Sequence, residues 1–216
     1  FVDMKTLSVP AIRAVEDGRV TFHPDRWEHV YMQWMENLHD WCISRQLWWG
    51  HRIPVFSCEE CGWEDALMED VETCPVCGAD VVQDPDVLDT WFSSQLWTFA
   101  TQGWPENPEE LEGHHPTTVL STARDIISLW VARMIMSSLY FLDEVPFHDV
   151  IIHPIVLAKD GTRRSKSKGN GVDPMDLIDS YGADAMRFGL LLQVTGSPDM
   201  RFDEDRIANA KSFSTK

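Results

Sequence analysis

The residues best suited to chemistry lie in one short basic segment. Its sequence is Arg163-Arg164-Ser165-Lys166-Ser167-Lys168-Gly169-Asn170, which places four cations and two hydroxyls beside a glycine in a protein of net charge -17. Lysine and arginine supply charge, serine hydroxyls supply hydrogen bonds, and glycine lets the backbone approach closely. The segment therefore predicts an anion site, with phosphate as the expected anion, although a solvated basic turn has the same composition.

The flanking sequence favours the phosphate interpretation. Residues 150–157 are mostly apolar and predict one or two buried strands. Asp173 and Pro174 follow the basic segment as a helix start, with a capping carboxylate before a proline at the first helical position. A basic loop between a buried strand and a helix is where open α/β sheets bind ligands.

Four of the five cysteines form a second candidate site. They stand as two Cys-x-x-Cys pairs separated by twelve residues, namely Cys58, Cys61, Cys74 and Cys77. This spacing predicts a tetrathiolate zinc site, and four thiolates leave no position for a substrate water, so we expect the metal to be structural. A disulfide framework is disfavoured because the chain does not resemble a secreted protein. The fifth cysteine, Cys42, is expected to be buried and apolar in role.

Size and composition limit the classes of function. The chain has 216 residues and is 44% hydrophobic, which is enough for one or two domains with a core. Its net charge of -17 argues against strong autonomous nucleic-acid binding, since such modules are usually basic. We expect no apolar run of membrane-spanning length, no secretory leader and no membrane partner.

The elements that must position these residues follow from hydrophobic spacing. Helices are predicted over residues 7–17, 26–38, 91–99, 125–142, 174–181 and 183–193, with a last helix from Asp203; strands over 20–22, 117–122 and 150–157; and a polar loop over 106–115. Strands that alternate with helices indicate an α/β fold. The helix over 125–142 is apolar nearly all round, so we expect it to be buried.

Three segments in order resemble one enzyme family. Residues 41–54, 88–94 and 163–167 resemble the catalytic segments of class I aminoacyl-tRNA synthetases of the valine-isoleucine-leucine group, and the third resembles the KMSKS loop. Within that group the valine enzymes are the most similar, because of Trp91-Phe92-Ser93-Ser94 and Trp130-Val131-Ala132-Arg133-Met134. Arg163 and Arg164 stand where the KMSKS motif has a lysine and a methionine.

The resemblance implies a domain organisation. It implies the second half of a Rossmann-like catalytic domain with an inserted zinc ribbon and a C-terminal helical segment. The expected parts are a helical connection over 1–40, the catalytic half over 41–56 and 84–170, the zinc ribbon over 57–83, and a helical segment over 171–216 that leads to an anticodon-binding domain.

The resemblance also implies a reaction. Valine would attack the α-phosphate of ATP, and the valyl group would then pass to tRNA(Val), with Mg²⁺ accompanying ATP. Lys166 corresponds to the second lysine of the motif and is the expected catalytic residue. Arg163, Ser165 and Ser167 are expected to contact ATP phosphates. Asp125 is expected to bind the ribose, and His153 to lie near the nucleotide.

The amino-acid pocket is implied in the same way. Trp91 and Trp130 correspond to aromatic residues that flank the amino-acid side chain in this family, and Ile126, one helical turn before Trp130, would narrow the pocket. Such a pocket excludes larger side chains but cannot strongly reject an isostere. On sequence alone, both tryptophans could equally be ordinary core residues.

Two alternatives remain open at this point. The chain could come from an isoleucine or leucine enzyme of the same class, or it could be a non-enzymatic zinc-ribbon interaction module. We find no HIGH-type motif in the chain. We therefore expect the isolated chain to be inactive and the intact enzyme to be cytoplasmic.

Overall fold

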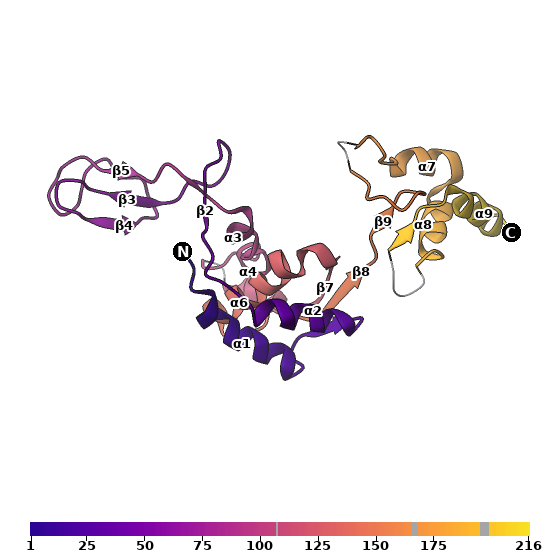
Figure 1. The fold of residues 1–216 in the computed structure, drawn as a ribbon, viewed down its shortest axis with the longest axis horizontal. Coiled ribbons are helices and arrows are strands. Elements are labelled where there is room, and N and C mark those ends of the chain that lie inside the picture. Colours follow the sequence, from indigo (N-terminus) through magenta and orange to yellow (C-terminus); the bar gives the residue numbers. More distant parts are fainter. Residues whose placement is uncertain (107, 166–167, 195–198) are drawn as a thin grey trace. The chain divides into compact units, whose positions relative to one another are not determined.

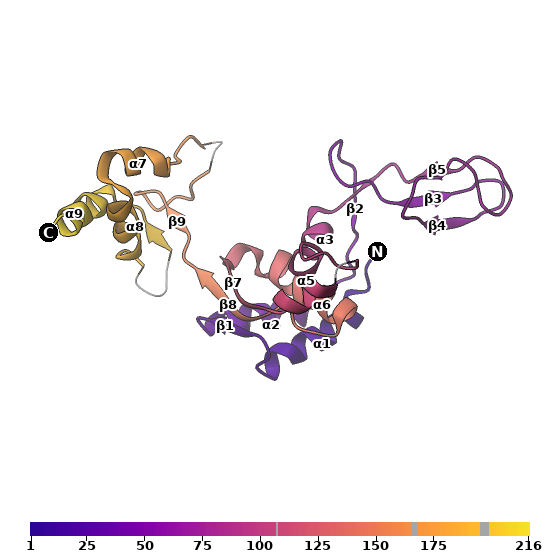
Figure 2. The same ribbon diagram turned by 180° about the vertical axis from the view of Figure 1, so that it is seen from behind.

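The computed structural model describes residues 1–106, 108–165, 168–194 and 199–216 (Figure 1). The chain divides into two compact units, Phe1–Ile151 and Ile152–Lys216. Figure 2 shows the same ribbon from behind.

The first unit mixes helices with short strands. Its elements are α1 (Met4–Glu16), β1 (Thr21–His23), α2 (Arg26–Met35), β2 (Ser44–Arg45), β3 (Val55–Ser57), β4 (Glu64–Ala66), β5 (Val82–Gln83), β6 (Val87–Leu88), α3 (Thr90–Ser94), α4 (Trp97–Ala100), α5 (Pro108–His114), β7 (Thr117–Ala123), a 3-10 turn η1 (Arg124–Ile126), a π-helical turn η2 (Ile127–Val131), α6 (Ala132–Leu142) and β8 (Phe147–His153), whose last two residues belong to the second unit.

The second unit holds the remaining elements. These are β9 (Val156–Leu157), α7 (Pro174–Tyr181), α8 (Ala183–Leu191), β10 (Met200–Arg201) and α9 (Glu204–Ser214). The predicted helix starts are confirmed, because Asp173 and Asp203 cap α7 and α9 through their side chains. Gly182, with φ of 93°, separates α7 from α8 as predicted.

The central sheet of the first unit has strand order β1-β8-β7. β1 and β8 are parallel, with Phe22 opposite Val150. Burial alternates along β8, where Phe147, Val150 and Ile152 are buried while Ile151 is exposed. The predicted segment 150–157 thus holds two strands, β8 and β9 (Val156–Leu157), but β8 is buried on one face only, because side chains of successive strand residues point to opposite faces.

The helical stretch Arg124–Leu142 packs into the core of the first unit. One helix is predicted over residues 125–142, but the stretch Arg124–Leu142 runs through 3-10, π and α geometry in turn. The stretch has 19 residues and a mean hydropathy of 1.4, so by length and composition it could cross a membrane. The expectation that the chain has no apolar run of this length is therefore wrong. Half of the stretch is buried within the unit. A helix in the core of a protein can have the same length and hydropathy as a membrane-spanning helix, so these two properties alone do not indicate a membrane span.

Three further predictions need correction. Residues 106–115, predicted as a loop, contain α5, which has glutamates in its first turn and a histidine in its last, as the helix dipole favours. The helix predicted over 91–99 is two short helices, α3 and α4. Cys42 is exposed rather than buried.

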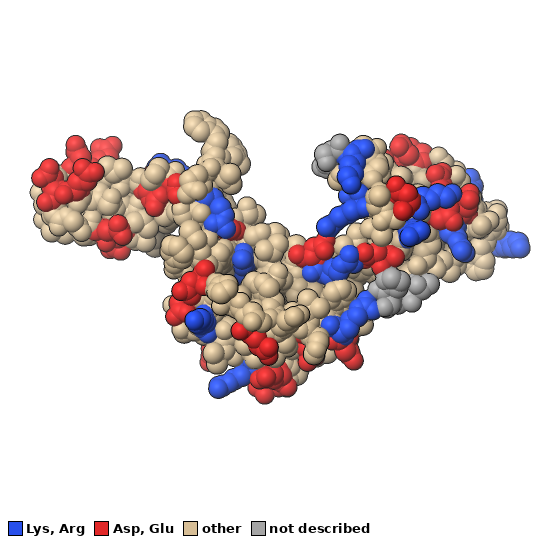
Figure 3. Space-filling model, in the orientation of Figure 1, with Lys and Arg blue, Asp and Glu red and all other residues tan. Residues whose placement is uncertain are grey.

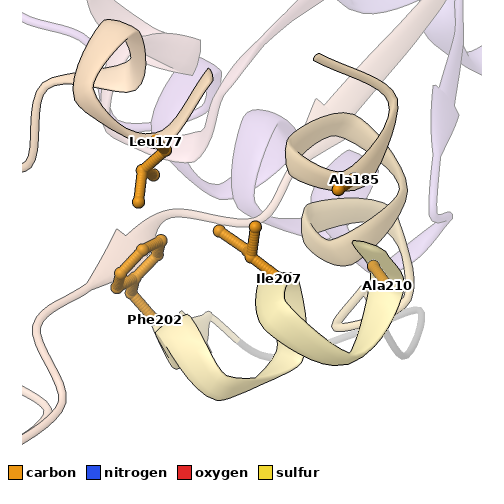
Figure 4. Close-up of a cluster of buried hydrophobic side chains, with 5 residues drawn as sticks. All are labelled: Leu177, Ala185, Phe202, Ile207 and Ala210. Carbon is orange, nitrogen blue, oxygen red and sulfur yellow. The ribbon is translucent and has the colours of Figure 1, made fainter. Parts of the chain in front are cut away.

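The core of the second unit is a small cluster of buried side chains. Figure 4 shows Leu177, Phe202 and Ile207 pointing toward one another, and Ala185 and Ala210 complete the cluster. Helices α8 and α9 approach closely, since a Cβ added at Gly189 would lie 2.8 Å from the Ile207 Cα. A larger residue at position 189 would therefore separate the two helices.

Candidate functional site

The four cysteines, two from the β3–β4 connection and two from the β4–β5 connection of a small sheet, converge on one point. This sheet has strand order β4-β3-β5. The sulfur atoms of Cys58 and Cys77 are 3.5 Å apart, those of Cys61 and Cys74 are 3.6 Å apart, and all four lie within 4.8 Å of one another. The four thiols could therefore hold one metal ion.

Both cysteine pairs have the same backbone geometry. The Gly62 N–H donates to the Cys58 carbonyl and the Gly78 N–H to the Cys74 carbonyl, each at 2.9 Å. The two glycines have φ of 71° and 76°, a region that disfavours side chains. Each pair is thus a tight knuckle that turns both sulfurs toward the same side.

The protein environment differentiates the thiols before any metal is bound. An N–H hydrogen bond from Trp63 lowers the pKa of Cys61, but desolvation and the neighbouring thiols outweigh it and raise that pKa to about 12. Burial acts to raise the pKa of Cys74, yet N–H groups of Cys77 and Val76 stabilise its thiolate and bring the pKa to about 7. The backbone N–H groups therefore favour the thiolate form of Cys74 more than that of Cys61.

The ribbon around this site is strongly acidic. Residues 57–83 contain eight carboxylates and no lysine or arginine. Figure 3 shows the red side chains gathered over this part of the chain, where β3 to β5 lie. Such a surface repels nucleic-acid phosphates.

The predicted pocket tryptophans are placed by the contact between α3 and the Arg124–Leu142 stretch. Trp91 is half-buried in the first turn of α3. Trp130, in η2, donates from its indole Nε1 to the carbonyl of Ser94, the last residue of α3, at 2.9 Å. Trp130 also packs edge-on against Trp97, with ring centroids 6.1 Å apart. The structure therefore joins Trp130 to the helix that carries Trp91.

The neighbours of this pair lie in irregular backbone. Ile126 adopts φ of -116° where the 3-10 turn meets the π turn, so the expected α-helical spacing between Ile126 and Trp130 is replaced by π geometry. Isolated π turns are frequent at functional sites. Asp125 is exposed, and its carboxylate lies 3.8 Å from the Arg124 Nε.

The backbone of the basic segment is hydrogen-bonded to the side chain of Asn170, within the same segment. Lys166 and Ser167 lie outside the described residues. Asn170 accepts from the Ser165 N–H at 2.9 Å and donates from Nδ2 to the Arg163 carbonyl at 3.3 Å. Arg163 also forms a bridge with Leu157 of β9. One asparagine side chain thus joins the two ends of the segment by hydrogen bonds.

Two other residues of the second unit complete the placement. The Arg164 guanidinium lies over the Phe202 ring, with its Cζ 4.6 Å from the centroid. His153 is exposed at the end of β8 and donates from Nδ1 to the Pro154 carbonyl at 3.0 Å.

The predicted site residues that the structure describes fall into three groups. The first is the four cysteines, whose sulfur atoms lie within 4.8 Å of one another. Trp91, Trp130, Ile126 and Asp125 belong to the unit Phe1–Ile151, whereas His153, Arg163 and Ser165 belong to Ile152–Lys216. Sequence reasoning did not single out Trp97 or Asn170. The only available signal for Asn170 was its position beside Gly169, and nothing distinguished Trp97 from the other tryptophans.

Known proteins match the whole chain. The family model described as tRNA synthetases class I (I, L, M and V) matches residues 1–203. A valine–tRNA ligase of Carboxydothermus hydrogenoformans is 54% identical over 217 residues, covering 100% of this chain and 25% of the relative. A valine–tRNA ligase of Clostridium tetani is 52% identical with the same coverage. The chain therefore spans about a quarter of the length of these curated relatives.

Solved structures agree on the fold. A LeuRS of Agrobacterium radiobacter K84, in a ternary complex with tRNA and LeuAMS, has a TM-score of 0.71 at 24% identity and covers 82% of this chain and 27% of that one. Mycobacterium tuberculosis methionyl-tRNA synthetase bound by methionyl-adenylate has a TM-score of 0.68 at 19% identity, with 96% of this chain and 35% of that one covered. The expected class I synthetase catalytic fold is confirmed, and this chain belongs to the family of class I tRNA synthetases (I, L, M and V).

Proposed function

We propose that the chain is part of a valine–tRNA ligase, which activates valine with ATP and transfers it to tRNA(Val). The observation that carries this proposal is its 54% and 52% identity, over its whole length, to ligases of that name. Isoleucine and leucine enzymes are not favoured by these relatives. A non-enzymatic zinc module is not favoured either, because the family model extends well beyond the ribbon.

The proposed first step transfers an adenylyl group. A carboxylate oxygen of valine attacks the α-phosphorus of ATP, and the bond to the bridging oxygen breaks, so that valyl-adenylate forms and pyrophosphate leaves. Negative charge builds on the leaving phosphates, and fixed cations that engage it more strongly in the transition state lower the barrier. Lys166 supplies this charge, Arg163, Ser165 and Ser167 bind the phosphates, and Mg²⁺ enters with ATP.

The proposed second step transfers the valyl group. A hydroxyl of the terminal ribose of tRNA(Val) attacks the valyl carbonyl, and AMP leaves. Asp125 binds the adenosine ribose, which suits its exposed carboxylate, and His153 lies near the nucleotide. Charging of tRNA supplies protein synthesis, so we place the intact enzyme in the cytoplasm.

The proposed amino-acid pocket lies at the contact between α3 and η2. Trp91 and Trp130 enclose the valine side chain, and Ile126 narrows the pocket. The hydrogen bond from Trp130 to Ser94 supports this assignment, because it fixes one indole against the helix that carries the other. A pocket gauged by rigid rings rejects a larger side chain by steric overlap.

The cysteine cluster fits structural zinc. Zn–S bonds of about 2.3 Å in a tetrahedron require sulfur separations of about 3.8 Å. Two of the separations here are 3.5 and 3.6 Å, and none exceeds 4.8 Å. Cys58, Cys61, Cys74 and Cys77 would hold the ion, which would join the two knuckles without taking part in the reaction.

The deciding experiment is amino-acid-dependent pyrophosphate exchange by the full-length parent. We expect valine to support exchange far better than isoleucine or leucine, followed by charging of tRNA(Val). Lys166→Glu should abolish exchange, whereas a zinc-ribbon interaction module would be indifferent to this change. The 216-residue chain alone should show no exchange; robust valine-dependent exchange by it would refute that part of the proposal.

A further inference from the structure

Arg133 is a buried cation that the proposed reaction does not use. Its side chain is only 7% exposed, and its Nε and Nη1 atoms make no hydrogen bond to any residue that the structure describes. Burial lowers its pKa to about 10, so it stays charged at neutral pH. A buried cation with two nitrogens that lack hydrogen bonds is costly, so it needs a compensating interaction.

The principal partner of Arg133 is the indole of Trp41. The guanidinium carbon lies 3.5 Å from the ring centroid, which is a stacked cation–π contact between a helix and a segment far away in the sequence. Trp41 is itself 8% exposed and packs against Phe92 of α3, with ring centroids 5.9 Å apart. Arg133 therefore reaches α3 through Trp41.

Asp89 is a second nearby group. Burial is the main cause that lowers the pKa of Arg133, Coulombic attraction to the Asp89 carboxylate acts to raise it, and Arg45 acts to lower it. Asp89 is 6% exposed. One of its oxygens caps α3 by accepting from the Trp91 N–H at 2.7 Å, and the other accepts from Arg45. Asp89 thus joins Arg45 to the first turn of α3.

These contacts bear directly on the two pocket tryptophans. Asp89 lies two residues before Trp91, and Arg133 lies three residues after Trp130. The far end of α3 is fixed to the same stretch by the Trp130–Ser94 hydrogen bond of 2.9 Å. α3 is therefore connected to the Arg124–Leu142 stretch at two places: Phe92 packs on Trp41, over which Arg133 stacks, and the Ser94 carbonyl accepts from Trp130.

We propose that Arg133 is a positioning residue for the amino-acid pocket: its guanidinium, stacked on Trp41 beside Asp89, sets where α3 holds Trp91 relative to Trp130. This inference rests on the proposed function. It assigns to Arg133 no contact with substrate. Because a pocket that gauges size depends on the separation of its walls, loosening α3 should weaken valine binding while leaving nucleotide binding in place.

The test uses the full-length parent, with KM for valine, KM for ATP and kcat measured by pyrophosphate exchange. Arg133→Met keeps a long unbranched side chain but removes the charge. We expect KM for valine to rise about tenfold and KM for ATP to stay within about twofold. Arg133→Lys, which keeps the charge but loses the planar stack, should lie between Arg133→Met and wild type.

Two further variants make the result specific. Arg13→Met removes an exposed arginine from α1 and should change neither KM. Trp41→Leu should raise KM for valine like Arg133→Met, and the double variant should be no worse than either, because the pair acts as one contact. If Arg133→Met does not fold, Arg133→Lys and Trp41→Leu decide by the same criterion.

The outcomes separate this inference from the proposed function. A parent that activates valine but is indifferent to Arg133→Met would overturn the positioning role alone. The same role is overturned if KM for valine, KM for ATP and kcat all change together, since that describes general loss of structure. A wild-type parent that activates isoleucine or leucine instead of valine would refute the proposed function, and this inference with it.

Discussion

The guanidinium of Arg164 lies over the ring of Phe202, with its Cζ 4.6 Å from the ring centroid. Phe202 is 8% exposed and belongs to the buried cluster between α7, α8 and α9. In the KMSKS motif that this segment resembles, the position of Arg164 is a methionine. The stacked arginine therefore replaces an apolar anchor by covering the same kind of surface with its planar face.

This contact predicts how substitutions at Arg164 behave in the full-length parent. Arg164→Met should keep KM for ATP within about twofold, because a thioether packs well on an aromatic ring. Arg164→Asp should raise KM for ATP about tenfold, since it removes the contact with the Phe202 ring and places a negative charge within the basic segment that is proposed to bind the ATP phosphates. Pyrophosphate exchange at varied ATP measures both. Arg187→Asp, an exposed change on α8, is the control; equal effects of the two aspartates would contradict the anchor.

The four-cysteine cluster predicts a metal stoichiometry. The purified chain should contain one zinc ion per molecule by elemental mass spectrometry. Cys74→Ser should reduce this content to background, because one missing thiolate destroys the tetrahedral set. Cys42→Ser is the matched control, since Cys42 is exposed and lies outside the cluster. Loss of metal from both variants would mean that the assignment of ligands is wrong.

Metal affinity should depend steeply on pH. The pKa of Cys61 is raised to about 12 and that of Cys77 is raised as well, so both are protonated thiols at neutral pH in the metal-free chain. Each must lose its proton to become a ligand, so binding releases at least two protons. Lowering the pH by one unit should therefore raise the apparent Kd about a hundredfold or more. Competition with a chromophoric chelator at pH 6.5 and 7.5 checks this, and equal Kd values would exclude it.

The packing of α8 on α9 predicts opposite effects of two glycine substitutions. A Cβ at Gly189 would lie 2.8 Å from the Ile207 Cα, whereas one at Gly113 in α5 would meet nothing within 4 Å. Gly189→Ala should lower the free energy of unfolding by about 1–2 kcal/mol despite its better helix propensity. Gly113→Ala should raise it by about 0.5–1 kcal/mol. Urea unfolding followed by circular dichroism compares them; a stable Gly189→Ala would show that the helices can separate freely.

Much of the local structure was predictable from the sequence. Helix starts at Asp173 and Asp203 were found because a capping carboxylate acts within three residues of the chain. The exposed faces of β8 and the helix α5 were missed. In β8, an apolar sequence does not reveal which face is covered, and in α5 the polar composition hid a helix stabilised by its charged ends.

The chain by itself determined its family, its cysteine cluster and its basic segment, because these depend on residue type and short spacing. Only the tertiary structure decided that Trp130 donates to Ser94, 36 residues away, and that Arg133 stacks on Trp41. Such contacts join side chains from elements that are distant in sequence, and their partners are chosen by packing density and by the need to compensate buried charge. Neither requirement leaves a periodic signal along the chain.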